Sequence, residues 1–101
     1  MSVYVVNNLL IHDRAAYGEY LSGFMEAFRG CGGEILAVQD SPKPFEGEWP
    51  YDRTVLLRFP SRESIAKWVE GPAYQAIIGH RQRGAKSNIV ILDAFALPGV
   101  K

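Results

Sequence analysis

The segment 53–61 shows how apolar and polar positions are distributed in this chain. It reads Arg-Thr-Val-Leu-Leu-Arg-Phe-Pro-Ser, and its β-branched and large apolar residues predict a short strand that ends at Pro60, just before a helix. A strand that faces water on one side alternates clearly between apolar and polar residues, and this one does not. We therefore expect both of its faces to be covered. Its residues form an apolar face and a mixed face, with Val55, Leu57 and Phe59 on the first and Thr54, Leu56 and Arg58 on the second.

Three further segments predict strands, at residues 3–11, 34–39 and 87–96. The first of these also lacks a polar face, but Asn7 and Asn8 interrupt it, and asparagine is disfavoured inside strands. A β-bulge at these two residues would account for them, as would the polar wall of a cavity. We favour the bulge.

Two segments carry apolar residues at helical spacing. The first follows Asp13, a residue suited to cap a helix, and ends at the glycines of residues 30–33. The second begins after Ser61, is broken at Gly71, and resumes at Pro72, which suits the first position of a helix. The inner faces are expected to carry Tyr17, Leu21, Phe24 and Phe28 in the first segment, and Ile65, Trp68, Val69, Tyr74, Ile77, Ile78 and Arg81 in the second.

The order strand–helix–strand–strand–helix–strand predicts an α+β fold, the ferredoxin-like βαββαβ plait, as a single domain over residues 1–101. This fold has a four-stranded antiparallel sheet, with the first and third strands central and two helices on one face. The opposite face would be bare, and an apolar patch of this size is unusual on a monomer. We therefore predict a homodimer in which the sheets of two subunits pack into a dimeric α+β barrel. The expected interface residues are Tyr4, Val6, Leu10, Leu56, Val90 and Leu92.

The connection 40–52 is longer than the two to five residues, roughly, that join most neighbouring strands. It contains the aromatic residues Phe45, Trp49 and Tyr51, which are poorly suited to lie free in water. It could pack on the body of the domain, pack on the partner subunit, or form a lid over a pocket. We favour packing on the partner.

Composition and charge narrow the classes of partner. Eleven basic residues balance eleven acidic ones, and no basic stripe is present, so we expect no binding to nucleic acid. No apolar run approaches the length of about 18 residues that spans a membrane. The single cysteine, Cys31, allows no internal disulfide and is typical of a reducing compartment. We therefore expect a cytoplasmic protein.

Short blocks across nearly the whole chain resemble a known family. The blocks, in order, are Asp13 to Tyr20, Gly32-Gly33, Phe45-Glu46-Gly47, Arg53 to Ser61, Trp68, Gly71 to Gln75, and Arg81. Together they are similar to the domain of unknown function numbered thirteen-thirty, in the dimeric α+β-barrel superfamily. The resemblance implies a ferredoxin-like dimer. The wider superfamily includes cofactor-free monooxygenases, isomerases of small molecules, haem-handling enzymes and stress-related binding proteins, so the fold alone implies no single activity.

Candidate site residues are polar or aromatic side chains that the predicted fold brings near one cavity. His12 and His80 are far apart in the sequence and no paired cysteines occur, so we expect neither a metal site nor a cofactor. Arg58, on a covered face, needs an anionic partner. We favour an ion pair with Glu46, Glu48 or the partner subunit, and the binding of an anionic ligand is the alternative. The candidate ligand-binding residues are Asn7, Glu48, Trp49, Arg58, Tyr74 and Arg81.

Two functions remain open at this point. The first is a homodimeric domain that binds a small molecule without turnover, because no convergent set of acid and base residues is visible. The alternative is a cofactor-independent enzyme, of the monooxygenase or isomerase type, that acts on a small aromatic or carboxylated substrate. In that enzyme, Arg58 would stabilise an anion, His12 or His80 would carry the proton, and Trp49 and Tyr74 would form aromatic walls. Tyr17 and Tyr20 are alternative catalytic phenols, although we interpret them as core residues.

Overall fold

The computed structural model describes residues 2–96 and has the predicted order of elements. Residue 1 and residues 97–101, which the single-domain prediction also included, lie outside the described part. The second helical segment consists of two helices, because Gly71 ends the first and Pro72 begins the next. The elements are β1 (Val3–Ile11), α1 (Arg14–Phe28), β2 (Glu34–Asp40), β3 (Arg53–Phe59), α2 (Arg62–Glu70), α3 (Pro72–Gly84) and β4 (Ala85–Asp93).

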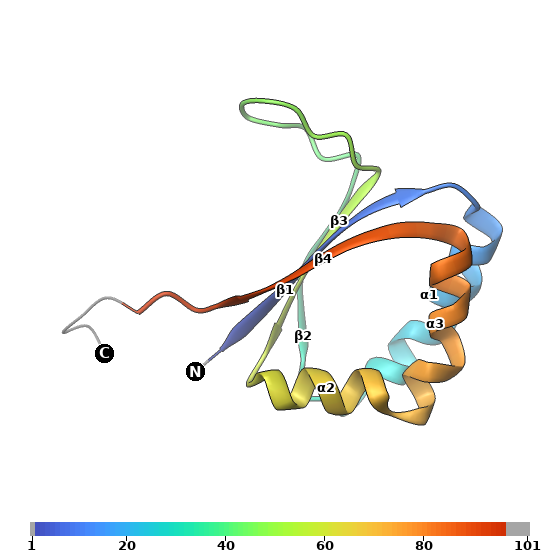
Figure 1. Ribbon diagram of the computed structural model, residues 1–101, viewed down its shortest axis with the longest axis vertical. Helices are drawn as coiled ribbons and strands as arrows, with labels where there is room; N and C mark the ends of the chain where they lie inside the picture. Colours follow the sequence, from blue (N-terminus) through green and yellow to red (C-terminus); the bar gives the residue numbers. More distant parts are fainter. Residues whose placement is uncertain (1, 97–101) are drawn as a thin grey trace.

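The four strands form one antiparallel sheet in the order β2-β3-β1-β4, with β1 and β3 central as predicted. All three helices lie on the same side of this sheet (Figure 1). The structure is therefore the predicted α+β ferredoxin-like fold. None of the helices in residues 2–96 has the length and apolar character needed to cross a membrane.

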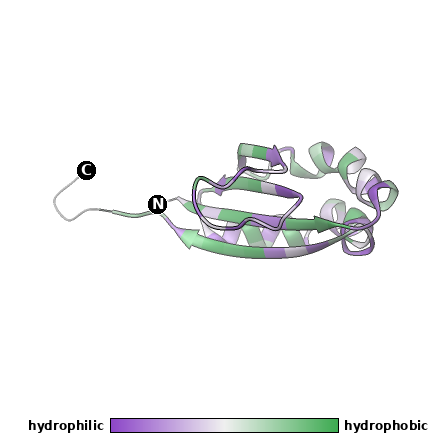
Figure 2. Ribbon diagram, turned by 90° about the horizontal axis from the view of Figure 1, so that it is seen from above, coloured by the Kyte–Doolittle hydropathy of each residue, from purple (hydrophilic) through white to green (hydrophobic). Residues whose placement is uncertain are grey.

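The strand register assigns each residue to one face of the sheet. Val5 lies opposite Leu57 and Ile91, and this face is turned toward the helices. The core lies on this side, and Leu9 and Phe59 are its most deeply buried large side chains. In Figure 2, apolar residues, in green, run along much of the length of the strands.

No element of residues 2–96 covers the opposite face of the sheet, and we call it the open face. Val6 lies on it, opposite Leu56 and Val90. Val90 and Leu92 are 52% and 50% exposed. The open face therefore carries the apolar residues that the sequence placed there.

The predicted bulge at Asn7 and Asn8 is wrong. β1 pairs with β3 and β4 in unbroken register through both residues. A central strand is bonded on both sides and has little room for an extra residue, whereas bulges favour sheet edges. The irregularity of this sheet lies in the edge strand β2, between Ile35 and Ala37.

The bounds of β4 also need correction. β4 begins at Ala85 and ends at Asp93, although residues 87–96 were predicted. Its early start follows from Gly84, whose carbonyl accepts hydrogen bonds from the backbone N–H groups of His12 and Asp13. In α1, Tyr17 and Tyr20 are both buried, as expected of core residues, and Leu21 of the predicted inner face is 40% exposed.

The connection between β2 and β3 projects beyond the end of the sheet as a loop (Figure 1). The end of this loop is hydrogen-bonded to β1 through Asp52. The Asp52 backbone N–H donates to the Leu9 carbonyl, and the Asp52 carboxylate accepts from the backbone N–H of Ile11 at 2.7 Å. Trp49 also contacts the body, through a hydrogen bond from its indole Nε1 to the Thr54 hydroxyl at 3.0 Å. Phe45, in contrast, is fully exposed.

Candidate functional site

A cavity of about 360 Å³ lies between the helix-covered face of the sheet and the helices, and we call it the sheet–helix cavity. Its volume falls within the range of about 300–1,000 Å³ that is typical of ligand pockets. Side chains from all seven elements line it, and most of them are apolar. The sheet contributes Val5, Ile35, Val38, Val55, Leu57, Ile89 and Ile91, and the helices contribute Leu21, Phe24, Met25, Ile65, Trp68, Val69 and Ile78.

The helix layer owes its shape to close packing of α1 against α3. A Cβ atom built at Gly84 would lie 2.5 Å from the Tyr17 backbone nitrogen, and one at Gly23 would lie 2.7 Å from Cγ2 of Ile77. Both positions therefore need the small size of glycine. The two helices meet over these glycines, and the cavity lies between this pair and the sheet.

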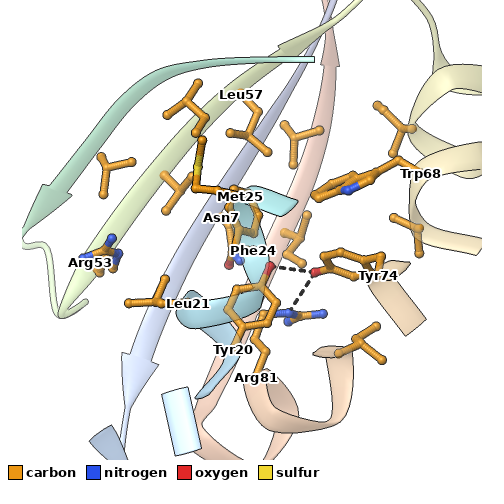
Figure 3. A pocket seen from close by; sticks show the side chains of 18 of the residues that line it. Asn7, Tyr20, Leu21, Phe24, Met25, Arg53, Leu57, Trp68, Tyr74 and Arg81 are labelled. Atoms are coloured by element: carbon orange, nitrogen blue, oxygen red, sulfur yellow. Dashed lines mark hydrogen bonds between the residues drawn. The ribbon is translucent and has the colours of Figure 1, made fainter. Parts of the chain in front are cut away.

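One end of the cavity is polar (Figure 3). The hydroxyls of Tyr20 and Tyr74 are hydrogen-bonded to each other at 2.8 Å. Arg81 donates from Nε to the Tyr74 hydroxyl at 3.3 Å and from Nη1 to the hydroxyl of Ser87. Burial, and then the neighbouring Tyr74, raise the pKa of the Tyr20 phenol, so this hydroxyl keeps its proton across the physiological range.

Arg81 is a buried cation at this polar end, only 9% exposed. No carboxylate oxygen of residues 2–96 lies within 4.0 Å of its guanidinium nitrogens. Its two hydroxyl partners satisfy hydrogen bonds but carry no compensating charge. Arg81 therefore gives the cavity a positive charge at its polar end.

Arg53, from the start of β3, is the second arginine of the lining. Its Nη1 donates to the exposed Asp40 carboxylate at 2.7 Å, and its guanidinium carbon lies 5.9 Å from the centre of the Tyr17 ring. The charge of Arg53 is therefore already paired, in contrast to that of Arg81.

Within residues 2–96, three buried polar atoms on residues of the cavity lining have no hydrogen-bond partner. They are Oδ1 of Asn7, Nε of Arg53 and Nε1 of Trp68, and all three residues belong to the lining. An unsatisfied buried polar group costs about 1–3 kcal/mol, and folded proteins contain few of them. Their gathering at one cavity, from three different elements, marks it as the candidate ligand site.

The structure brings together half of the predicted ligand-binding residues. Asn7, Tyr74 and Arg81 line the sheet–helix cavity, whereas Glu48, Trp49 and Arg58 do not. The prediction that Arg58 pairs with Glu46 or Glu48 is wrong. Arg58 lies on the open face and forms hydrogen bonds of 2.9–3.0 Å with Glu34, which stands opposite it in the β2–β3 register.

The predicted proton carriers lie outside the cavity. His12 is exposed between β1 and α1, and Nδ1 of His80 is 2.6 Å from Nη2 of Arg83 on α3. In the described residues, no cluster of three or more His, Cys, Asp or Glu side chains could hold a metal ion. The sequence did not predict Arg53, Tyr20 or Trp68 as cavity residues. A usable signal was present for Trp68, because a tryptophan on the inner face of a helix places an indole N–H that needs a hydrogen-bond acceptor inside the fold.

Solved structures similar to this chain share its fold at low sequence identity. A protein of unknown function from Rhodopseudomonas palustris, RPA0582, matches with a TM-score of 0.79 and 17% identity, over 95% of this chain and 84% of that chain. SnoaB from Streptomyces nogalater, described as a cofactor-independent oxygenase, matches with a TM-score of 0.64 and 11% identity, over 98% of each chain. A dimeric ferredoxin-like protein of unknown function from Jannaschia sp. CCS1 matches with a TM-score of 0.67 and 16% identity, over 93% of this chain and 100% of that chain.

These likenesses show the ferredoxin-like fold and no more, because the identities are low. No curated protein matches the chain. One family model, described as "Domain of unknown function (DUF1330)", matches residues 2–95, which is nearly the whole sequence. The chain therefore belongs to the DUF1330 family, as its sequence blocks indicated.

Proposed function

We propose that this protein is a homodimer that binds a small, largely apolar molecule in the sheet–helix cavity. The observation that carries this proposal is the set of three buried polar atoms, on the lining residues Asn7, Arg53 and Trp68, that lack hydrogen-bond partners within residues 2–96. A ligand with complementary polar groups would satisfy these atoms where the side chains turn toward it, and its apolar part would fill the cavity.

The chemistry of the lining favours binding over acid–base turnover. Within residues 2–96, the ionisable residues of the lining are two arginines and three tyrosines. Arginine does not lose its proton in proteins, and burial raises the pKa values of Tyr17 and Tyr20. At neutral pH, the two arginines and these two tyrosines all carry their protons, so they are not suited to accept one from a substrate.

A cofactor-independent enzyme is the second candidate. Arg81 favours it, because a buried guanidinium in apolar surroundings would stabilise an anionic oxygen that forms on a bound substrate. The structural neighbour SnoaB is described as a cofactor-independent oxygenase, which agrees with this alternative at the level of the fold. The two candidates differ in whether the bound compound is consumed.

The dimer is supported by the open face and by the neighbours. Val90 and Leu92 lie half exposed on an apolar sheet face that no element of residues 2–96 covers. Contiguous apolar patches of this kind mark protein–protein contacts. The Jannaschia protein and a second neighbour, from Bacteroides fragilis, are both described as dimeric with a ferredoxin-like fold.

Met25 offers a test of the cavity that does not disturb the core. It lines the cavity and is 60% exposed, so it lies at the opening. We expect Met25→Trp to block entry, and Met25→Leu to serve as the matched control. The measurement is a thermal-shift screen of aromatic acids, quinones and haem. A ligand present at a concentration of 100 times its Kd raises the free energy of unfolding by about 2.7 kcal/mol. For a domain of this size, this increase raises Tm by roughly 10 °C.

At least one compound should raise the Tm of the wild type and of Met25→Leu, with a much smaller shift for Met25→Trp. The proposal fails if nothing in the screen shifts the wild type, or if Met25→Trp responds as the control does. Oxygen uptake and product analysis with the same compounds then separate binding from turnover.

A further inference from the structure

We infer that the ligand of the sheet–helix cavity is a small aromatic carboxylic acid whose carboxylate binds Arg81. This rests on the proposed function and adds the chemical class of the ligand.

The charge of Arg81 is not balanced by an opposite charge within residues 2–96. A buried charge is costly unless an opposite charge and hydrogen bonds accompany it. Arg81 has hydrogen bonds to Tyr74 and Ser87, but no carboxylate of the described residues is near. Arg53, the other arginine of the lining, is paired with Asp40. One positive charge thus remains at the cavity, and a monoanionic ligand would balance it.

The geometry of the guanidinium donors also favours a carboxylate. An arginine side chain has five N–H groups in one plane. Arg81 uses one of them, at Nε, for the Tyr74 hydroxyl and one, at Nη1, for the Ser87 hydroxyl. The remaining N–H groups of Arg81 have no hydrogen-bond acceptor within residues 2–96. A planar carboxylate matches such a donor pair, because its two oxygens accept parallel hydrogen bonds.

The surface that faces the rest of the ligand is aromatic. Tyr20, Phe24, Trp68 and Tyr74 form a connected aromatic group at the cavity, with ring centres 4.5–5.9 Å apart. Figure 3 shows these rings and Arg81 gathered around one part of the cavity. Aromatic side chains pack well on the faces and edges of another ring. An aromatic body next to the carboxylate therefore fits this wall.

The test compares an acid with its neutral isostere by isothermal titration calorimetry. Naphthoic acid and naphthamide have nearly the same shape, but only the acid is charged at neutral pH. We expect the wild-type dimer to bind the acid roughly tenfold or more tightly, because only the carboxylate brings an opposite charge to the buried guanidinium. Affinity for the acid should also fall about tenfold for each pH unit below the acid's own pKa, since its neutral form lacks the charge.

Arg81→Gln should remove the preference for the acid. Arg83→Gln is the matched control, because Arg83 lies on the same helix and outside the lining, and it should keep the preference. Near-ultraviolet circular dichroism checks that both variants fold. If Arg81→Gln does not fold, the comparison of acid with amide on the wild type still decides the inference.

The outcomes separate this inference from the proposed function. Equal binding of acid and amide by the wild type overturns the anion assignment and leaves the cavity a ligand site. Retention of the preference by a folded Arg81→Gln overturns it as well. If neither compound binds, the naphthoate class is overturned, and the Met25 comparison alone decides whether the cavity binds anything.

Discussion

Arg58 and Arg81 differ in their surroundings, and this difference decides which of them is suited to bind an anionic ligand. Arg58 lies on the open face, where the hydrogen bonds that it donates to Glu34, and then the negative charge of Glu34, raise the pKa of the guanidinium further. Its charge is paired within the chain. Arg81 is more deeply buried, and its hydrogen-bond partners within residues 2–96 are two hydroxyls. Of these two, Arg81 is therefore the one suited to bind an anionic ligand.

The hydroxyls of Tyr20 and Tyr74 hold Arg81 in place. Arg81 donates to Tyr74, and the two phenols share a second hydrogen bond. Because burial raises the pKa of Tyr20, its phenol keeps the proton that this hydrogen bond uses over the physiological range. The polar end is thus organised before a ligand arrives, which lowers the entropy cost of binding.

At the scale of elements, the crossing of α1 and α3 depends on Gly84. We expect Gly84→Ala to destabilise the fold by about 1–3 kcal/mol, because its Cβ would lie 2.5 Å from the Tyr17 nitrogen and 2.9 Å from the Asp13 carbonyl oxygen. Gly18→Ala is the control, since nothing lies within 4 Å of the added Cβ. That change in a helix should be neutral or stabilise by roughly 0.5–1 kcal/mol.

Urea unfolding of the two variants measures this difference. If Gly84→Ala is as stable as Gly18→Ala, the close approach of the two helices is not what shapes the cavity roof.

Most elements could be predicted because their signals are local. Asp13 accepts from the N–H groups of Ala15 and Ala16, as expected of a capping residue, and Pro72 begins α3. The start of β4 was mispredicted because it depends on a distant contact, between the Gly84 carbonyl and the β1–α1 junction. The absence of a bulge at Asn7 likewise reflects pairing on both sides of β1.

The candidate site was less predictable, because it is assembled from distant segments. The partner of Arg58 depends on the β2–β3 register, and the irregularity after Ile35 hides this register from the sequence. Arg81 was predicted as a ligand-binding residue from its place on an inner helix stripe. That no carboxylate of residues 2–96 pairs with it becomes visible only when the fold brings β1, β3 and the helices around one cavity.

At the scale of the whole molecule, the two faces of the sheet have separate roles. The helix-covered face borders the cavity, and the open face is proposed as the dimer contact. If the chain forms the proposed homodimer, Val90→Lys on the open face should convert it into a monomer, because the change places a charge in an apolar contact. Ile89→Lys is the matched control, since Ile89 is similarly exposed, at 46%, but lies on the helix side.

Light scattering coupled to size-exclusion chromatography gives the mass of each protein. The wild type and Ile89→Lys should have twice the mass of one chain, and Val90→Lys the mass of one. A wild type that stays monomeric at micromolar concentration, with a stable fold, would refute the dimer.

Binding in the sheet–helix cavity is tested most directly by the two indole N–H signals in nuclear magnetic resonance spectra of isotope-labelled protein. Trp68 lines the cavity and has a buried Nε1 without a partner in residues 2–96, whereas Nε1 of Trp49 donates to Thr54, outside the cavity. On titration with naphthoate, the Trp68 signal should shift and saturate, and the Trp49 signal should stay in place. Binding that leaves Trp68 unchanged, or that moves Trp49 instead, would contradict a ligand site in this cavity.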